Sequence, residues 1–112
     1  MKEIVIFITS GSEEEAKRLA QVLVEEKLAA CVNILSGVES LYWWKGKLES
    51  SKEWMLVVKT QRKMAKKVIK RVKEIHSYEV PEVIALPIVQ GNKDYLRWIS
   101  DALALRKKKG DL

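Results

Sequence analysis

The segment 41–47 places four large apolar side chains directly before a turn. It consists of Leu41, Tyr42, Trp43, Trp44, Lys45, Gly46 and Lys47. Successive side chains on a strand point to opposite faces of a sheet, so a run without alternation puts bulky groups on both faces of one hairpin. A domain core covers only one of those faces, and contiguous exposed apolar surface usually marks a contact with another molecule. We therefore expect an obligate oligomer built around this hairpin.

The length of the chain allows one domain. The 112 residues, 47% of them hydrophobic, supply enough material for a single core. We expect residues 1–112 to form that domain, with a frayed basic tail over 106–112. The formal charge of 21 − 15 = +6 permits anionic partners but selects none. Abundant Lys and Glu together also fit a thermostable protein.

The sequence contains one cysteine, Cys31, so no disulfide can form within the chain. The first apolar run is short and ends at Ser10, Gly11 and Ser12, unlike a secretion signal. No stretch approaches the roughly 20 apolar residues that span a bilayer. We therefore expect a cytoplasmic protein without a membrane partner.

Apolar periodicity predicts the first two elements. The continuous apolar run 4–8 predicts a strand buried on both faces. Ser12 and the three glutamates after it form a capping box for a helix that should run to about Lys27. One stripe of that helix should face the sheet, with Ala16, Leu19, Ala20 and Leu23.

A long hairpin follows. Residues 29–35 predict its first strand, and Gly37 predicts a bulge or bend before 38–44. The chain can reverse at Lys45 and Gly46, because Gly46 tolerates positive φ, and it should return as a strand over 47–59. The tip of this bent hairpin should project beyond the body of so small a domain.

The last third of the chain predicts two helices and a strand. Thr60 is the expected N-cap of a lysine-rich, solvated helix whose buried stripe contains Met64, Val68, Val72 and Ile75. Residues 83–89 predict a strand at an edge or with a bulge, because Pro87 cannot donate a ladder hydrogen bond. A final helix should begin near Asn92 and bury Tyr95, Leu96, Ile99 and Leu103.

The predicted order is strand, helix, hairpin, helix, strand, helix. A hairpin in the middle favours the α+β class and the ferredoxin-like split βαβ arrangement, an antiparallel sheet with both main helices on one face. The C-terminal helix is an addition to it. The other sheet face would be bare, and sheet packing between subunits would cover it.

Several blocks along the chain also resemble one protein family. They are Ala30-Cys31-Val32-Asn33, Tyr42-Trp43-Trp44-Lys45-Gly46-Lys47, Lys59-Thr60, His76-Ser77-Tyr78-Glu79-Val80-Pro81-Glu82 and Tyr95-Leu96-Arg97-Trp98. In this order and spacing they resemble the CutA family, the divalent-cation-tolerance proteins, over nearly the whole chain. The resemblance implies a PII-like homotrimer, a cytoplasmic location and an association with copper and other divalent metals.

This resemblance implies a non-enzymatic function in divalent cation tolerance, with metal ions or a small ligand bound at subunit junctions. A PII-like signalling or scaffold trimer with only an indirect link to metals is the alternative. A single chain offers one Cys and one His without metal-ligand spacing. In an oligomer, copies of Cys31 or His76 could converge, or His76 could combine with Glu79 or Glu82. Since thiolate and imidazole suit copper, these four residues are the metal candidates for copper or another divalent cation, and no organic cofactor is expected.

Ordinary structural roles compete with these assignments. Cys31 also suits a small core residue, and His76 also suits the C-terminal end of a basic helix. For the hairpin rings we favour an interface over an aromatic pocket. The interface or pocket candidates are Tyr42, Trp43, Trp44, Lys59, Tyr78 and Trp98. Lys59 could hold an anion near the subunit junction, and the alternative is an ordinary solvated lysine.

Two other function classes lack their signals. An acylphosphatase needs an Arg-bearing anion loop after the first strand, and the loop 9–12 contains no Arg. An RNA recognition motif stacks bases on paired strand aromatics, a signature that 54–59 does not supply. We therefore expect neither an enzyme nor a nucleic-acid partner.

Overall fold

Four strands and three α-helices alternate along residues 2–104, which are the residues that the computed structural model describes. The elements are β1 (Glu3–Ser10), α1 (Glu13–Glu25), β2 (Cys31–Trp44), β3 (Lys47–Gln61), the 3₁₀ turn η1 (Arg62–Met64), α2 (Ala65–Ile75), β4 (Val83–Pro87) and α3 (Lys93–Ala104). The predicted element order is confirmed. The predicted basic tail, 106–112, lies outside the described residues.

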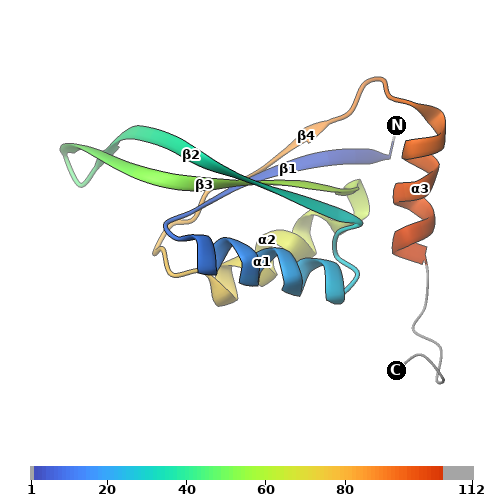
Figure 1. Ribbon diagram of the computed structural model, residues 1–112, viewed down its shortest axis with the longest axis horizontal. Helices are drawn as coiled ribbons and strands as arrows, with labels where there is room; N and C mark the ends of the chain where they lie inside the picture. The colour runs from blue at the N-terminus through green and yellow to red at the C-terminus, as the bar shows by residue number, and fades with distance from the viewer. Residues whose placement is uncertain (1, 105–112) are drawn as a thin grey trace.

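The strands form one sheet in the order β2-β3-β1-β4, and all neighbours are antiparallel. Helices α1 and α2 lie against the same face of this sheet, whereas α3 stands at one end of it (Figure 1). The predicted ferredoxin-like α+β fold with an extra C-terminal helix is therefore confirmed. No helix in the described part of the chain is long and apolar enough to cross a membrane.

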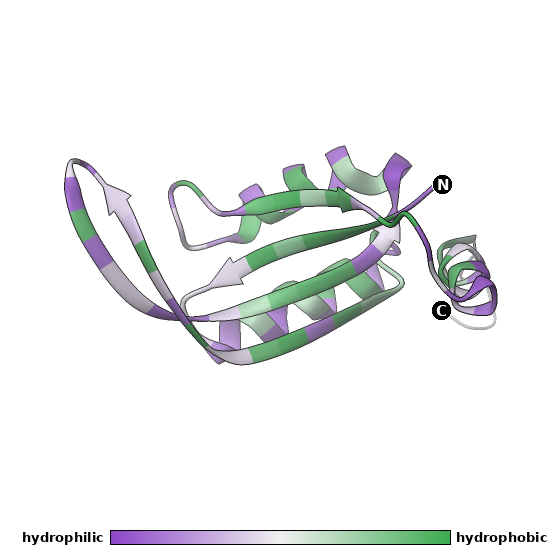
Figure 2. Ribbon diagram, turned by 90° about the horizontal axis from the view of Figure 1, so that it is seen from above, coloured by the Kyte–Doolittle hydropathy of each residue, from purple (hydrophilic) through white to green (hydrophobic). Residues whose placement is uncertain are grey.

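The core fills the space between the two helices and the inner face of the sheet. Alternate residues of the central strands point inward and are buried, because side chains on a strand alternate between faces. The large aliphatic side chains of this core that have no exposed surface are Ile6, Ile8, Leu19, Leu23, Leu56, Val58, Val68 and Val72. In Figure 2 the hydrophobic colour is concentrated in the strands of the sheet body, where this core lies.

The opposite face of the sheet, here called the outer sheet face, carries a second apolar set. Cross-strand pairing places Phe7 between Val57 of β3 and Ile84 of β4. The whole apolar set is Val5, Phe7, Leu35, Met55, Val57, Ile84 and Leu86. Leu35 and Ile84 remain 47% and 50% exposed. The first strand is therefore not buried on both faces within its own chain, and the predicted bare sheet face is confirmed.

The β2–β3 hairpin bends and extends beyond the rest of the sheet as predicted (Figure 1). A register shift lies between Leu35 and Val38, where Gly37 has a φ of +78°. Lys45 and Gly46 close the hairpin with φ angles of +50° and +80°, which is the backbone geometry of a type I′ turn. We call residues 38–53 beyond the shift the hairpin arm.

The beginning of α1 also follows the sequence prediction. Ser12 has an extended backbone, and its hydroxyl accepts a hydrogen bond from the Glu15 N–H at 3.1 Å. The three glutamates of the first turn lie at the positive end of the helix dipole.

The predicted helix N-cap at Thr60 is wrong. Thr60 lies inside β3, opposite Ile4, and its buried hydroxyl donates to the Leu28 carbonyl at 2.7 Å. Pairing with β1 continues to Gln61, so the α-helix begins only at Ala65, after η1. The pairing partner is distant in sequence and outweighs the local capping preference.

The prediction for the last helix is correct in position but only partly correct in burial. Ile99 and Leu103 of α3 are buried, whereas Tyr95 is 41% exposed. The helix stands at the end of the sheet, so only part of its surface can pack against the sheet (Figure 1). Tyr95 lies outside that buried part and stacks on Trp98, with ring centroids 5.5 Å apart. Strand β4 lies at a sheet edge, as predicted, and ends at Pro87.

Candidate functional site

His76 joins the end of α2 to the end of β1. Its backbone N–H donates to the Val72 carbonyl at 2.8 Å and closes the helix. The side chain has no exposed surface, with Nε2 2.7 Å from the Thr9 carbonyl oxygen and Nδ1 accepting from the Tyr78 N–H at 3.0 Å. Because a carbonyl only accepts, this arrangement selects the neutral ring with its proton on Nε2. Both ring nitrogens are thus occupied by backbone groups.

Glu15 fixes the same segment from α1. Its carboxylate accepts from the Ser77 N–H at 2.7 Å and from the Ser77 hydroxyl at 3.0 Å. Burial raises the pKa of Glu15, but the hydrogen bonds from Ser77 and from the Gly11 N–H, with the charge of His76 once its ring is protonated, outweigh burial and hold the pKa below its usual value of 4.5. Glu15 is therefore an ionised carboxylate whose hydrogen bonds to Ser77 hold residues 76–78 in place.

We expect Glu15→Gln to reduce the loss of stability in acid. A carboxyl group whose pKa is lower in the folded than in the unfolded chain contributes stability above the unfolded pKa, and this stability is lost as pH falls through the folded pKa. The free energy of unfolding should therefore fall less from about pH 5 to pH 3 in the variant than in wild type. Urea unfolding at a series of pH values measures this difference. The control is Glu14→Gln, an exposed change in the same helical turn, and equal acid sensitivity of wild type and Glu15→Gln would contradict the assignment.

Tyr78 connects this segment to the base of the hairpin arm. Its hydroxyl donates to Glu53 at 2.8 Å, and its ring lies 4.7 Å from that of His76. Burial first, and then the Glu53 hydrogen bond, raise the pKa of Tyr78 and keep the hydroxyl a donor. A Cβ at Gly11 would lie 2.9 Å from the Tyr78 oxygen, so the close approach requires glycine there.

Glu53 and Glu82 complete what we call the hairpin-base cluster, together with Tyr78. Glu53 is buried, at 7% exposure. Partial loss of hydration and the charge of Glu53 raise the pKa of Glu82. Two carboxylates that disfavour each other's charge, beside a tyrosine hydroxyl, can attract a cation or a hydrogen-bond donor from a ligand.

Cys31 lies in another part of the molecule. It is half-buried at the start of β2, opposite Lys59, whereas Thr9, the partner of His76, pairs with Met55 further along β3. Its neighbour is Tyr95 of α3, whose pKa is raised by burial and then by Cys31. The structure therefore places Cys31 and His76 apart within one chain.

The remaining predicted site residues are at least partly exposed to solvent. Lys59 is half-buried, Glu79 is exposed, and Trp98 is 45% exposed beside Tyr95. On the hairpin arm, Trp43 and its cross-strand partner Leu48 are 74% and 60% exposed. Large apolar groups are exposed on both faces of the arm, as predicted, with Leu41, Trp43 and Leu48 on one and Tyr42 and Trp44 on the other.

The metal candidates do not form a metal centre within one chain. Among residues 2–104, no three His, Cys, Asp or Glu side chains lie together in a way that could hold an ion. His76 would have to release one of its two backbone partners to become a ligand. The fit of a metal to these residues therefore depends on donors from a second chain.

Comparison with known proteins identifies the family. Residues 4–102 match the family model described as CutA1 divalent ion tolerance protein. The divalent-cation tolerance protein CutA of Thermus thermophilus is 48% identical over 99 residues, which are 88% of this chain and 96% of that protein. The chloroplastic protein CutA 1 of rice is also 48% identical over 88% of this chain, but the match covers only 56% of the rice protein. The chain thus spans little more than half the length of that plant relative.

Solved structures have the same fold. The Thermus thermophilus CutA1 structure superimposes with a TM-score of 0.84 and 49% identity, covering 87% of this chain and 94% of the other. The structure of the Archaeoglobus fulgidus protein, titled a periplasmic divalent cation tolerance protein, gives a TM-score of 0.87 at 44% identity, covering 90% and 98%. With its family model matched over 99 of 112 residues and relatives at this identity, the chain belongs to the CutA1 divalent ion tolerance family.

Proposed function

We propose that the chain assembles as a homotrimer that acts in divalent cation tolerance without catalysis. Metal ions, copper first among them, or a small ligand would bind at its subunit junctions. One observation carries the proposal: large apolar side chains of the outer sheet face and the hairpin arm remain exposed in the single chain, next to the hairpin-base cluster. The names of the relatives support the link to divalent cations.

The proposed metal ligands come from different chains. Cys31 lies near α3, whereas His76 and Glu82 lie at the other end of the sheet, so one subunit presents only part of a ligand set. Packing of the outer sheet faces would bring the arm of one subunit beside another subunit. The exposed Glu79 and Glu82 would then lie near that contact. Carboxylates there could complete an oxygen-rich site, while Cys31 and His76 supply the softer donors that copper prefers.

The proposed function requires neither a catalytic step nor a location outside the cytoplasm. Both nitrogens of His76 are bound to backbone groups, so the ring is not poised as a general base. We propose a cytoplasmic location and retain the expectation of thermal stability, which relatives from Thermus and Archaeoglobus support. A signalling or scaffold trimer, with metal tolerance as an indirect effect, is the competing assignment.

Copper titration should separate the candidate ligands. Calorimetry on the assembled wild type should show saturable Cu²⁺ binding, and Cys31→Ser or His76→Ala should bind about tenfold or more weakly, since losing a metal ligand costs at least that much. Lys67→Ala, an exposed change on α2, is the control and should bind as wild type does. Identical isotherms for all variants would dismiss both residues as ligands, and an absence of binding would favour the indirect, scaffold role.

A further inference from the structure

A concave site of about 630 Å³ lies at the end of the sheet opposite the hairpin arm. Its lining residues come from the segment before β1, the end of β3, the turn η1 and helix α3: Lys2, Gln61, Arg62, Lys63 and Ser100. The N-terminal end of β1 and helix α3 lie at the same end of the molecule in both Figure 1 and Figure 2. No candidate residue from the sequence patterns belongs to this site, which we call the β1–α3 pocket.

The backbone fixes two of the cations beside each other. The Arg62 N–H donates to the Lys2 carbonyl at 2.7 Å, which continues the pairing of β1 and β3 by one step. One residue earlier, Gln61 is 4% exposed and donates to the Glu3 carboxylate at 3.2 Å. Lys2 and Arg62 therefore border the pocket from two hydrogen-bonded strand ends.

The charge of the pocket is strongly positive. Three of the five lining residues are cations and the other two are neutral. Glu3, which follows Lys2 in the sequence, is 8% exposed and accepts from Gln61, and the three cations with this carboxylate sum to 3 − 1 = +2. Within the described residues, no carboxylate lies within 4.0 Å of the charged groups of Lys2, Arg62 or Lys63. A bound anion would relieve the repulsion among these cations.

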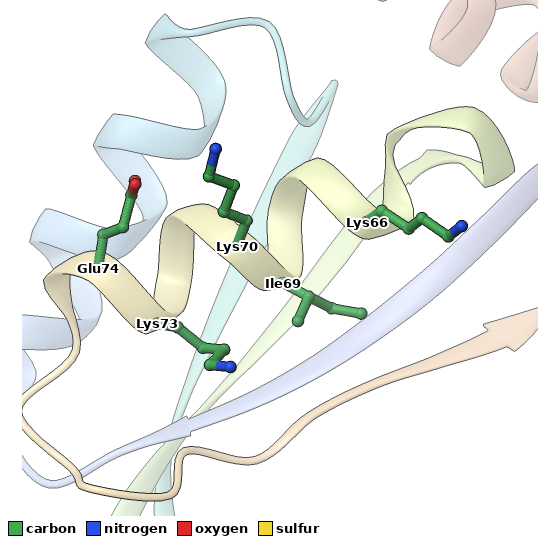
Figure 3. Close-up of a pocket in the computed structure, with 5 residues that line it drawn as sticks. All are labelled: Lys66, Ile69, Lys70, Lys73 and Glu74. Carbon is green, nitrogen blue, oxygen red and sulfur yellow. The ribbon is translucent and has the colours of Figure 1, made fainter.

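The basic surface of α2 is a useful contrast. Its groove, shown in Figure 3, is lined by residues of one helix only, and Glu74 is among them. Lys70 and Lys73 project from that helix in different directions in Figure 3, so their charges do not converge on one point. In the β1–α3 pocket, by contrast, charges from two separate segments border one cavity with a hydroxyl from a third.

We propose that the β1–α3 pocket binds a small ligand with two or more linked phosphates. A guanidinium fork and two ammonium groups match the oxygens of a diphosphate, and the Ser100 hydroxyl and Gln61 amide can add neutral hydrogen bonds. The volume lies within the range of small-molecule sites. The pocket shares no lining residue with the proposed metal ligands, and the proposal does not depend on metal binding.

Pyrophosphate tests the assignment on the metal-free full chain. Calorimetry at about 150 mM salt, where long-range charge effects are screened, should show saturable binding. The double variant Arg62→Gln and Lys63→Gln should bind about tenfold or more weakly. The control removes the same charge from α2, as Lys66→Gln and Lys70→Gln, and should stay within about twofold of wild type.

Several outcomes would overturn the proposal. Equal weakening in both double variants would mean diffuse electrostatic attraction, and an absence of saturation by about 5 mM pyrophosphate would mean no site. Citrate, a trianion without phosphate, should bind more weakly; equal affinity would refute the phosphate assignment. NMR titration of wild type is independent of variant folding: amide shifts should centre on Lys2, Arg62 and Ser100, and shifts centred on α2 would contradict the site.

Discussion

Val57→Glu is expected to convert the proposed homotrimer into a folded monomer. Val57 lies at the centre of the outer sheet face, between Asn33 of β2 and Phe7 of β1, and it is half-buried in the single chain. If sister chains cover this face, the variant buries an unpaired carboxylate in every subunit contact. The free-energy cost of that burial is far larger than the stabilisation that a surface ion pair contributes. In the monomer the same carboxylate stays in water, so the fold itself should survive.

Light scattering after size-exclusion chromatography measures this effect. A wild-type trimer of 12.9 kDa chains has a mass of about 39 kDa, and the variant should elute near 12.9 kDa with a wild-type circular dichroism spectrum. Ile69→Glu is the matched control, because Ile69 is an exposed apolar residue of α2, away from the outer sheet face. It should keep the wild-type mass. A folded wild-type monomer in dilute buffer would refute the assembly itself.

Leu19→Ala should have the largest effect on the stability of the subunit. The Leu19 side chain is fully buried between α1 and the inner face of the sheet. Removing three of its carbons loses their burial and leaves a cavity, which typically costs about 2–5 kcal/mol of unfolding free energy. Guanidinium unfolding should report this loss, measured at one fixed chain concentration because the proposed assembly would make the midpoint depend on concentration.

Val24→Ala supplies the comparison within the same helix. Val24 is 39% exposed, so its truncation should cost no more than about 1 kcal/mol. A loss of similar size in both variants would mean that α1 does not pack through the stripe containing Leu19.

Local signals predicted most of the fold. Ser12 with its glutamates, the reversal at Lys45 and Gly46, and the bulge at Gly37 each act within a few residues, and each lies where expected. The failures involve distant partners. Thr60 has the chemistry of an N-cap, but pairing with Ile4 keeps it in a strand, and nothing near Thr60 in the sequence encodes that pairing.

The candidate site was less predictable than the fold for the same reason. His76 and Glu82 could be selected by resemblance, yet of the residues that fix the site Glu15 is predicted only as part of the capping box, and Glu53 has no predicted role. Glu15 meets Ser77 across 62 residues of chain, and Glu53 meets Tyr78 across 25. Glutamates in a first helical turn and in an exposed-looking strand are ordinary, so a single sequence carries no signal for either role. Correlated changes at these positions among homologues could have revealed them.

The register shift at Gly37 decides which aromatic rings the arm shares with the outer sheet face. Two residues of β2, Ser36 and Gly37, lie opposite one residue of β3, Trp54, so even-numbered positions of β2 take over the face that odd-numbered ones held before. Tyr42 and Trp44 thereby continue the apolar surface of the sheet body. Losing one residue there would leave the pairing of the arm with β3, and the side to which Tyr42 and Trp44 point, unchanged, but it would remove the bulge that bends the strand. The length of this short stretch, more than its composition, therefore governs the direction in which the arm leaves the sheet.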